Sequence, residues 1–600
     1  MTSRNLHISM KIKHISLVFA LLLGAQTSLF AGTDDITRAM RDELQRSLTQ
    51  LALPTLQRPY YIEYTLTMRD AQNMKASLGG VVHERHSPTA TLSVGIRVGR
   101  QEFDNTNYFD VSLGFFGSSD DEEGFKNRRV PLELDYAALR REIWLASDAA
   151  YKQAAELYAK KEASIKNRLR TDTTPDFKLL PQQTLADTGA IPGFDANYFR
   201  QLCMDLSSVF KEYSSIAASS VGVEFTPERV YYVNSEGREF QKTEYYAGLE
   251  VVASTQASDG MTLANVYSCY TQNPANFPNK DSLMKAVQAT AATLNRMTFA
   301  PTLADGYSGP VLFEDQAAAE VMAQVFTPNL VAQRSPLTER GMQESDRYSA
   351  FQNKIGGRVL PEFLSIVATP DKPMFNTTSL IGSYTIDDDG IPAQQVNLVE
   401  NGYLKTLLTS RIPTKKLKQS NGHQRGGAAM LSTIELRAKP EKKADKQLDA
   451  NALRQKMMKI CKDRDLPFGL IVRKVLNQNI LFTALYEQTA GEYPFAQGDT
   501  KLSLLEVYKV YPNGKEELIR GSEGAGFTVQ AFKDIIAVGK KQSAYNYLAP
   551  AIASPFVTGG AQYIGSSIIV PDILFEDVEI RPLEGDFPKP PFLVSPLGKK

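Results

Sequence analysis

The feature that most constrains this chain is a long stretch in which apolar and polar residues alternate. The alternation runs from Pro59 to Phe116 and is clearest in Thr91-Leu92-Ser93-Val94-Gly95-Ile96-Arg97-Val98. Successive side chains of a strand point to opposite faces of its sheet, so alternation is typical of strands with one buried face. The pattern therefore predicts that the folded part of the chain opens with a sheet of half-buried strands.

Two amphipathic helices and a hairpin are expected after these strands. Asp135 is a good first residue for a long helix, because the apolar residues that follow it recur every three or four positions and would form one stripe facing the sheet. A proline-bearing polar connector from Pro175 to Pro192 separates this helix from the second one. The stripe of the first helix is Leu139, Ile143, Ala146, Ala150, Ala154 and Leu157; that of the second is Phe199, Leu202, Leu206 and Phe210; the hairpin turn is Asn234-Ser235-Glu236-Gly237.

The character of the chain changes after Tyr307-Ser308-Gly309-Pro310. From there, short strands bounded by Gly, Pro and Asn dominate, with helices expected only near 315–326 and 449–462, and a hairpin at Tyr511–Lys515. The length of 600 residues exceeds what one hydrophobic core usually organises. We expect an α+β fold, divided into a leader at 1–31, a helix-and-sheet domain at 32–300 and a mainly β domain at 301–600.

The first residues have the pattern of a secretory leader. Lys11 and Lys13 precede the apolar run Ile15–Leu23, and small or polar residues follow as far as Ala31. This order predicts export, with cleavage near Ala31, and a periplasmic or cell-envelope location. The alternative is a membrane anchor, but the apolar run is shorter than the roughly 20 residues that a spanning helix needs. Translation can start at Met1 or at Met10, since the pattern holds for both.

Charge and cysteine content exclude several other classes of protein. Lys plus Arg and Asp plus Glu both number 67, so no net charge draws the whole chain to nucleic acid or to anionic lipid. The three cysteines, Cys203, Cys269 and Cys461, are too few for a disulfide framework and lack the C-x-x-C spacing of metal and redox sites. Each is expected to be a small buried residue.

Four segments in the second half, in this order and spacing, resemble the TldD/PmbA family of metallopeptidase-like proteins, formerly described as modulators of DNA gyrase. The likeness is to the exported branch of that family. It extends more weakly over the first half of the chain. The segments are Tyr307–Glu314 with Ala317-Ala318-Ala319-Glu320; Gly382-Ser383-Tyr384 with Asp387–Ala393; Glu400–Lys405 with Ser410-Arg411; and Ser420-Asn421-Gly422-His423.

The resemblance implies a zinc site in catalytic relatives, formed by an H-E-x-x-x-H helix and a distant Cys, in which Glu is the general base. In this chain the same positions hold Ala323 and Gln324 in place of the first His and the Glu, and Pro328 in place of the second His. The stretch Thr558–Ser566, where the Cys would fall, has none. We therefore expect no metal or cofactor of its own. Pro328 also predicts that the helix turns away before it.

Other candidate sites each have a plainer interpretation. His83 and His86 are three residues apart, so in a strand they point to opposite faces and do not chelate one ion. His423 and Arg425 are candidate peptide contacts, or simply part of a polar turn. Asp387-Asp388-Asp389-Gly390 and the acidic loop Ser118–Gly124 are read as turns rather than calcium sites.

The resemblance also implies partners and a function. Family members pair as dimers around an internal cavity and act on peptides or unfolded segments. The favoured hypothesis is a non-catalytic subunit that shapes such a cavity, as a homodimer or with a zinc-bearing relative. An independent peptide-binding or scaffold protein, and a metallopeptidase with a relocated metal site, are the alternatives.

Overall fold

The structure is a computed structural model that describes most of the chain. The predicted leader, the acidic loop at 118–124 and the first part of the stretch at 558–566 lie outside the described residues. Among the helices that are described, none is long and apolar enough to cross a membrane. The described residues are 33–109, 128–166, 173–334, 336–338, 350–439, 445–477, 502–550, 563–591, 593 and 595–597.

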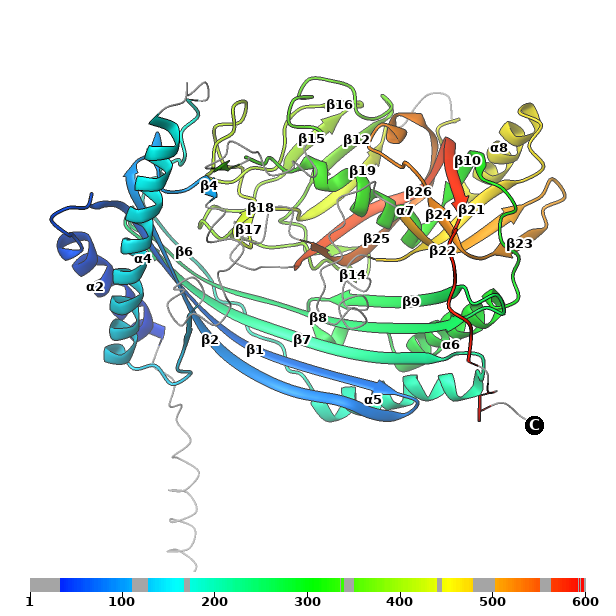
Figure 1. The fold of residues 1–600 in the computed structure, drawn as a ribbon, viewed down its shortest axis with the longest axis horizontal. Helices are drawn as coiled ribbons and strands as arrows, with labels where there is room; N and C mark the ends of the chain where they lie inside the picture. Colours follow the sequence, from blue (N-terminus) through cyan, green and yellow to red (C-terminus); the bar gives the residue numbers. More distant parts are fainter. Residues whose placement is uncertain are drawn as a thin grey trace, which may run out of the picture.

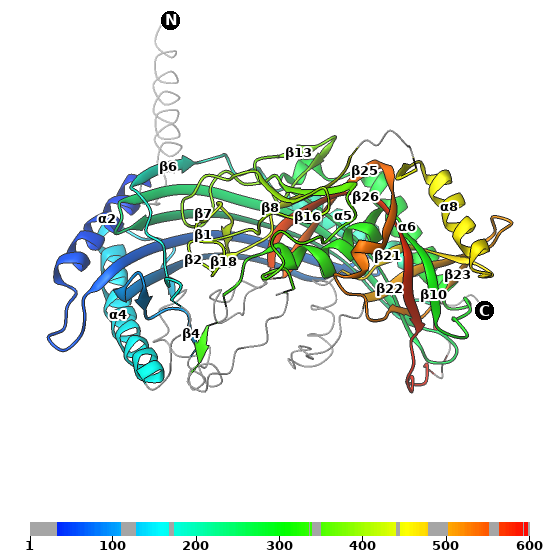
Figure 2. The ribbon, with the colours of Figure 1, turned by 90° about the horizontal axis from the view of Figure 1, so that it is seen from above.

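The first half of the chain builds an eight-stranded, largely antiparallel sheet whose long strands run along the length of the molecule (Figure 2). The predicted alternation is present: Ile62, Tyr64 and Leu66 are fully buried on one face of the first strand, and the residues between them turn to the other face. The strand order is β3-β2-β1-β7-β8-β6, with β5 beside β2 and β9 beside β8. The strands are β1 (Pro59–Ser77), β2 (Gly80–Arg100), β3 (Phe103–Asp104), β5 (Arg128–Val130), β6 (Gln183–Asp187), β7 (Ala218–Asn234), β8 (Arg238–Gln256) and β9 (Thr262–Thr271).

The hairpin between β7 and β8 forms where it was predicted. Its last turn residue, Gly237, has a φ of +75°, which a residue without Cβ adopts at no steric cost. The Asn234 side-chain oxygen accepts hydrogen bonds from the backbone amides of Glu236 and Arg238, both at 3.0 Å. This Asn-centred turn fixes the register of β7 against β8.

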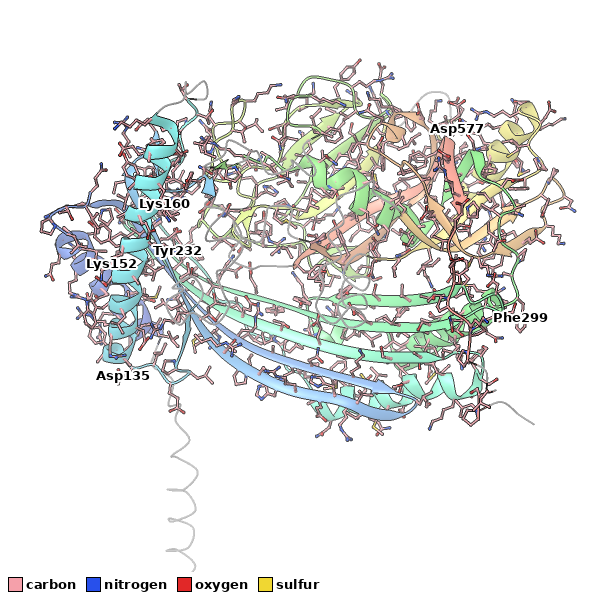
Figure 3. The ribbon with its side chains drawn as sticks, in the orientation of Figure 1. Asp135, Lys152, Lys160, Tyr232, Phe299 and Asp577 are labelled. Carbon is pink, nitrogen blue, oxygen red and sulfur yellow. The ribbon has the colours of Figure 1, made fainter. Side chains whose placement is uncertain are left out.

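Four helices cover the outer face of this sheet, two at each end (Figure 1). The first long helix begins at the predicted place, where the Asp135 carboxylate accepts a hydrogen bond from the Ala138 amide at 2.6 Å and so caps the helix; Figure 3 shows Asp135 at its end. Leu139, Ile143 and Ala146 of that helix are buried against the sheet as the periodicity predicted. The helices are α2 (Thr33–Gln50) and α4 (Tyr136–Lys166) at one end, and α5 (Ala196–Ser208) and α6 (Lys280–Met297) at the other.

The second half of the chain builds a twelve-stranded sheet whose hydrogen-bonded neighbours close into a ring. The ring order is β10-β21-β22-β24-β26, and β26 pairs back with β10. Parallel and antiparallel pairs are mixed in this sheet. The strands are β10 (Tyr307–Phe313), β12 (Leu364–Ala368), β15 (Val396–Glu400), β16 (Tyr403–Leu404), β19 (Thr433–Ala438), β20 (Gln447–Leu448), β21 (Gly469–Val475), β22 (Leu502–Val510), β23 (Glu516–Ile519), β24 (Ser522–Gly524), β25 (Ile535–Pro550) and β26 (Tyr563–Pro582).

Two further helices and three small sheets complete the second half. Helix α8 (Ala450–Asp463) and the β22–β23 hairpin lie where they were predicted. The helical run predicted near 315–326 is formed by helix α7 (Asp315–Val321) and the π-helical segment Met322–Phe326 that continues it. With helices packed on one face of a largely antiparallel sheet and a mainly β second half, the predicted α+β class is confirmed. The small sheets pair β4 (Tyr108–Phe109) with β11 (Leu337–Thr338), β13 (Met374–Phe375) with β14 (Thr378–Ser379), and β17 (Gln424–Arg425) with β18 (Ala428–Ala429).

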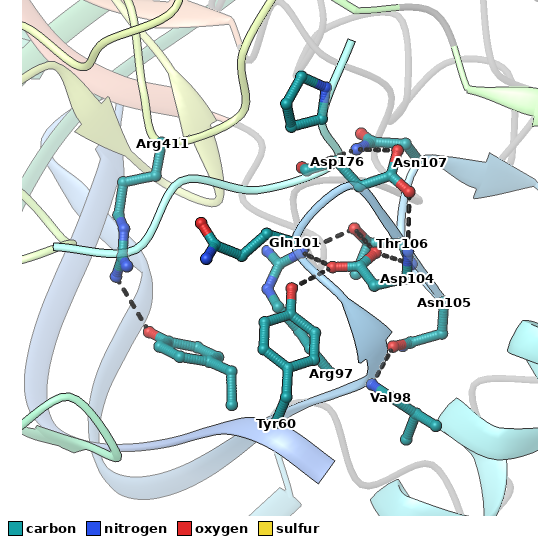
Figure 4. Close-up of polar contacts among 12 residues, drawn as sticks. Tyr60, Arg97, Val98, Gln101, Asp104, Asn105, Thr106, Asn107, Asp176 and Arg411 are labelled. Carbon is teal, nitrogen blue, oxygen red and sulfur yellow. Dashed lines mark hydrogen bonds and ion pairs between the residues drawn. The ribbon is translucent and has the colours of Figure 1, made fainter. Parts of the chain in front are cut away.

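Buried charged side chains join the inner face of the first sheet to loops of the second half. Arg411 is 1% exposed and donates to both carboxylate oxygens of Glu236, each at 2.7 Å, and to the Tyr61 hydroxyl at 3.2 Å. Figure 4 shows Arg411 near a second polar group, in which the guanidinium of Arg97 contacts Asp104. Charges buried in this way need their partners, because an unpaired buried charge is costly.

Candidate functional site

The segment that the sequence resemblance matched to a zinc helix begins as α7 and then changes pitch. Residues Met322–Phe326 form a π-helix, and Thr327–Leu330 form a 3-10 turn. The helical run therefore continues through Pro328, so the predicted turn before this proline was wrong. Proline's missing amide hydrogen is tolerated because the pitch changes at that point, and Pro328 lies in the first turn of the 3-10 segment. Short π-helical turns inside helices are frequent at functional sites.

Glu320 is the charged residue at the centre of this segment. Its side chain is 1% exposed. One carboxylate oxygen accepts a hydrogen bond from the Gln324 side-chain nitrogen, and the other accepts from the Tyr545 hydroxyl, both at 2.7 Å. Burial raises the pKa of Glu320 to about 7, while these two hydrogen bonds act in the opposite direction. The side chain is thus close to half-protonated at neutral pH.

A small cavity lies beside Glu320. It has about 10 Å³ of space for the centre of a water-sized molecule, which is roughly the room that one water needs. The Tyr547 hydroxyl is buried at its wall and makes no hydrogen bond to any residue in the described part of the chain. The cavity is lined by Glu320, Ala323, Gln324, Asn477, Tyr547, Leu548 and Pro550.

Two of the three positions singled out in the sequence meet at this cavity. Ala323 and Gln324 line it, whereas Pro328 is buried outside its wall. Gln324 donates to Glu320 and to the Leu476 carbonyl oxygen at 2.7 Å, so its amide is held in place; an amide also cannot take a proton as a carboxylate does. The cavity wall holds no His or Cys, so its donors do not fit a zinc site of the family type.

Metal ligands do not gather elsewhere in the part of the chain that the structure describes, where no three His, Cys, Asp or Glu side chains could hold an ion together. His86 pairs with Asp70 on the neighbouring strand, and His83 is exposed on the same strand. The Asp387 carboxylate accepts from the amides of Asp389 and Ile391 in the predicted tight turn, at 3.0 and 2.8 Å. The three cysteines are free thiols.

The two candidate peptide contacts lie together around Tyr384. His423 is fully buried; its ring contacts the Asn421 carbonyl at 2.9 Å, and burial lowers the pKa of His423 to about 4, so the ring is neutral. Arg425 donates to the carbonyls of Leu431 and Gly565 at 3.0 and 2.9 Å, and its guanidinium lies 4.8 Å from the centre of the Tyr384 ring. A contact with peptide stays a prediction for both residues.

Sequence reasoning did not assign roles to Glu320, Asn477, Tyr545 and Tyr547. Glu320 lies one helical turn before Gln324, so the two side chains share a face, and this spacing was a signal in the sequence. Tyr545 and Tyr547 lie two residues apart on β25, and their rings stack with 6.0 Å between the ring centres. Nothing local connects them to Glu320, because 225 residues separate it from Tyr545.

Comparison with known proteins shows which family the second half of the chain resembles. Residues 307–581 match the family model of the PmbA/TldA metallopeptidase C-terminal domain. The fold and this match define a metallopeptidase-like protein built on two sheets. The second half of this chain is therefore a C-terminal domain of the TldD/PmbA type. A comparison with curated protein sequences finds no match.

Solved structures of similar fold include three from this group of proteins. A candidate modulator of a DNA gyrase from Thermotoga maritima superposes with a TM-score of 0.52 at 13% identity, over 87% of this chain and 96% of that one. TldE from Thermococcus kodakarensis superposes with a TM-score of 0.51 at 12% identity, over 90% of this chain and 100% of that one. A candidate modulator of DNA gyrase from Bacteroides thetaiotaomicron superposes with a TM-score of 0.53 at 12% identity, over 92% of this chain and 100% of that one. At these identities the likeness concerns the fold alone.

Proposed function

We propose that this chain is an exported, non-catalytic subunit of a TldD/PmbA-type assembly that helps to form a peptide-holding cavity. The observation that carries the proposal is the chemistry at the aligned positions. Ala323 offers a methyl group, and the Gln324 amide is already committed to Glu320 and the Leu476 carbonyl. A hydrolytic metal site needs at least three protein ligands and a base for the water. The described cavity wall offers one carboxylate, Glu320, and no His or Cys, which is too few side chains to hold a metal and also provide a base for its water.

The first prediction concerns metal. Protein purified from its native envelope fraction should carry well under one zinc per chain by elemental mass spectrometry, and should show no peptide cleavage that a chelator stops. A zinc-bearing family member prepared in parallel is the control. Stoichiometric zinc together with chelator-sensitive cleavage would contradict the proposal and favour a relocated metal site.

N-terminal sequencing of the same sample tests the proposed export. We expect the mature chain to start near Gly32.

The second prediction concerns assembly. A subunit that shapes a shared cavity should be dimeric in solution, with itself or with a zinc-bearing relative, through an interface of about 2,000 Å² or more. Light scattering after size exclusion, on the chain alone and after mixing with that relative, measures this directly. We expect a mass of two chains in at least one sample. A monomer in both at micromolar concentration would remove the subunit role and leave an independent peptide-binding protein.

A further inference from the structure

Glu320 is a buried acid with no basic partner within the described residues, as is Asp387, whose carboxylate accepts from backbone amides. Several other buried acids of this chain do have a basic partner. Asp104 pairs with Arg97 at 2.9 Å, Asp176 with Lys161 at 2.6 Å, and Glu236 with Arg411. The partners of Glu320 are instead an amide nitrogen and a phenol, both neutral. A carboxylate in this position lacks the charge that would stabilise its ionised form, and it lines a cavity that can hold such a charge.

The cavity wall presents hydrogen-bond acceptors around a water-sized space. The Glu320 carboxylate can accept further bonds beyond the two that it makes, and the Tyr547 oxygen has no bond to any described residue. The Asn477 side chain adds an amide to the same wall, and its nitrogen donates to Ser268 at 3.3 Å. An ammonium group has three hydrogens to donate and accepts none. Its three donors match these three polar side chains of the wall, and its positive charge matches the Glu320 carboxylate.

The rest of the wall is apolar. Ala323, Leu548 and Pro550 form it, and they would contact the carbon atoms next to an ammonium nitrogen. A doubly charged metal ion suits the site less well, because the wall offers only one carboxylate. The combination of one unpaired carboxylate, one unbonded hydroxyl and a water-sized space therefore selects a singly charged nitrogen group over a metal.

We propose that the cavity beside Glu320 binds the primary ammonium group of a peptide, either its free N-terminus or the end of a lysine side chain. This inference rests on the proposed peptide-holding function and names the group by which the peptide would be recognised. Because Glu320 must be ionised to attract the cation, binding should strengthen between pH 6 and 8, as the proton held by the buried carboxyl is lost.

The test compares three short labelled peptides of the same length: a free N-terminus without lysine, an acetylated peptide with one lysine, and an acetylated peptide with norleucine in its place. Fluorescence anisotropy at pH 8 should show at least about tenfold tighter binding of one of the first two than of the third, and which one identifies the source. Glu320→Gln should abolish the preference. Ala323→Val, which fills the cavity and keeps the carboxylate, should do the same.

Glu435→Gln is the matched control, because Glu435 is a buried acid in another part of the fold, paired with Lys372 and Arg437. It should keep the preference for the peptides that carry an ammonium group.

If wild type binds all three peptides equally, the ammonium site is wrong and the peptide-holding function stands. If no peptide binds, that function fails, and thermal unfolding in methylammonium chloride tests the site alone. There, wild type should unfold about 1 °C or more higher than in tetramethylammonium or potassium chloride, and Glu320→Gln should not. Equal values for wild type in these salts would overturn the site.

Discussion

Replacing Arg411 by Met should lower the free energy of unfolding by about 3–5 kcal/mol, the largest loss that we expect from a single substitution in this chain. The guanidinium is 1% exposed and holds both oxygens of Glu236, the Tyr61 hydroxyl and the Lys178 carbonyl. Methionine fills part of the volume but leaves the Glu236 carboxylate buried without a cation. Scanning calorimetry, with the fluorescence of Trp144 as a second probe, measures the loss.

Two further variants show whether the lost pairing is the cause. Lys152→Met breaks an ion pair with Asp148 on the exposed face of α4 (Figure 3), where both side chains are about half exposed, and should cost less than about 1 kcal/mol. The double variant Arg411→Met, Glu236→Gln removes both charges and should recover part of the loss. If Arg411→Met were as stable as Lys152→Met, the buried contacts between the two halves would not stabilise the fold.

Replacing Glu320 by Gln should make the protein more stable at pH 8, by about 3 kcal/mol, and leave it unchanged near pH 4. Burial raises the pKa of Glu320 from 4.5 to about 7, so between these values the folded chain holds a proton that the unfolded chain has released. The stability contributed by this group is complete below pH 4.5 and is lost as the pH rises towards 7. A neutral glutamine has no such loss.

Unfolding midpoints of both proteins from pH 4 to 8 give the difference directly. Glu435→Gln provides a control of opposite sign. Although burial acts to raise the pKa of Glu435, hydrogen bonds from Arg437 and Lys372 outweigh it and lower that pKa. Its ionised form therefore stabilises the fold above pH 4.5, and the variant should be less stable there. A constant difference between Glu320→Gln and wild type across the range would show that Glu320 ionises normally in the folded chain.

The sequence predicted those elements whose signals are local. Alternation from Pro59 onward predicted β1 and β2, the apolar spacing after Asp135 predicted α4, and the turn Asn234–Gly237 predicted the β7–β8 hairpin. Each of these patterns is a relation between residues close in the sequence, and each depends on one buried face or one turn. In the second half, local signals predicted short strands, α8 and the β22–β23 hairpin. The long strands β25 and β26, of 16 and 20 residues, were not predicted.

Sequence reasoning could not find what depends on distant residues. The partner of Glu320 is Tyr545, and Arg411 reaches Glu236 across 175 positions, so neither site has a signature that a window of sequence could contain. The change to π-helical pitch at Met322 was missed for a related reason, since packing on distant strands can override a helical periodicity that continues unchanged. The three positions singled out by the resemblance were therefore located, but the cavity that Ala323 and Gln324 share with Asn477 and Tyr547 was not.

The position of β26 determines when the second half can fold during synthesis. This strand, Tyr563–Pro582, is the last in the sequence, yet it pairs with β10, β19, β24 and β25 and closes the ring. Until it has been made, the fully buried Leu312 and Phe313 of β10 lack the strand that covers them. A ribosome-bound chain must therefore carry an unfinished hydrophobic core for more than 250 residues of elongation, and the apolar surface of β10 stays open to aggregation until the last strand is made.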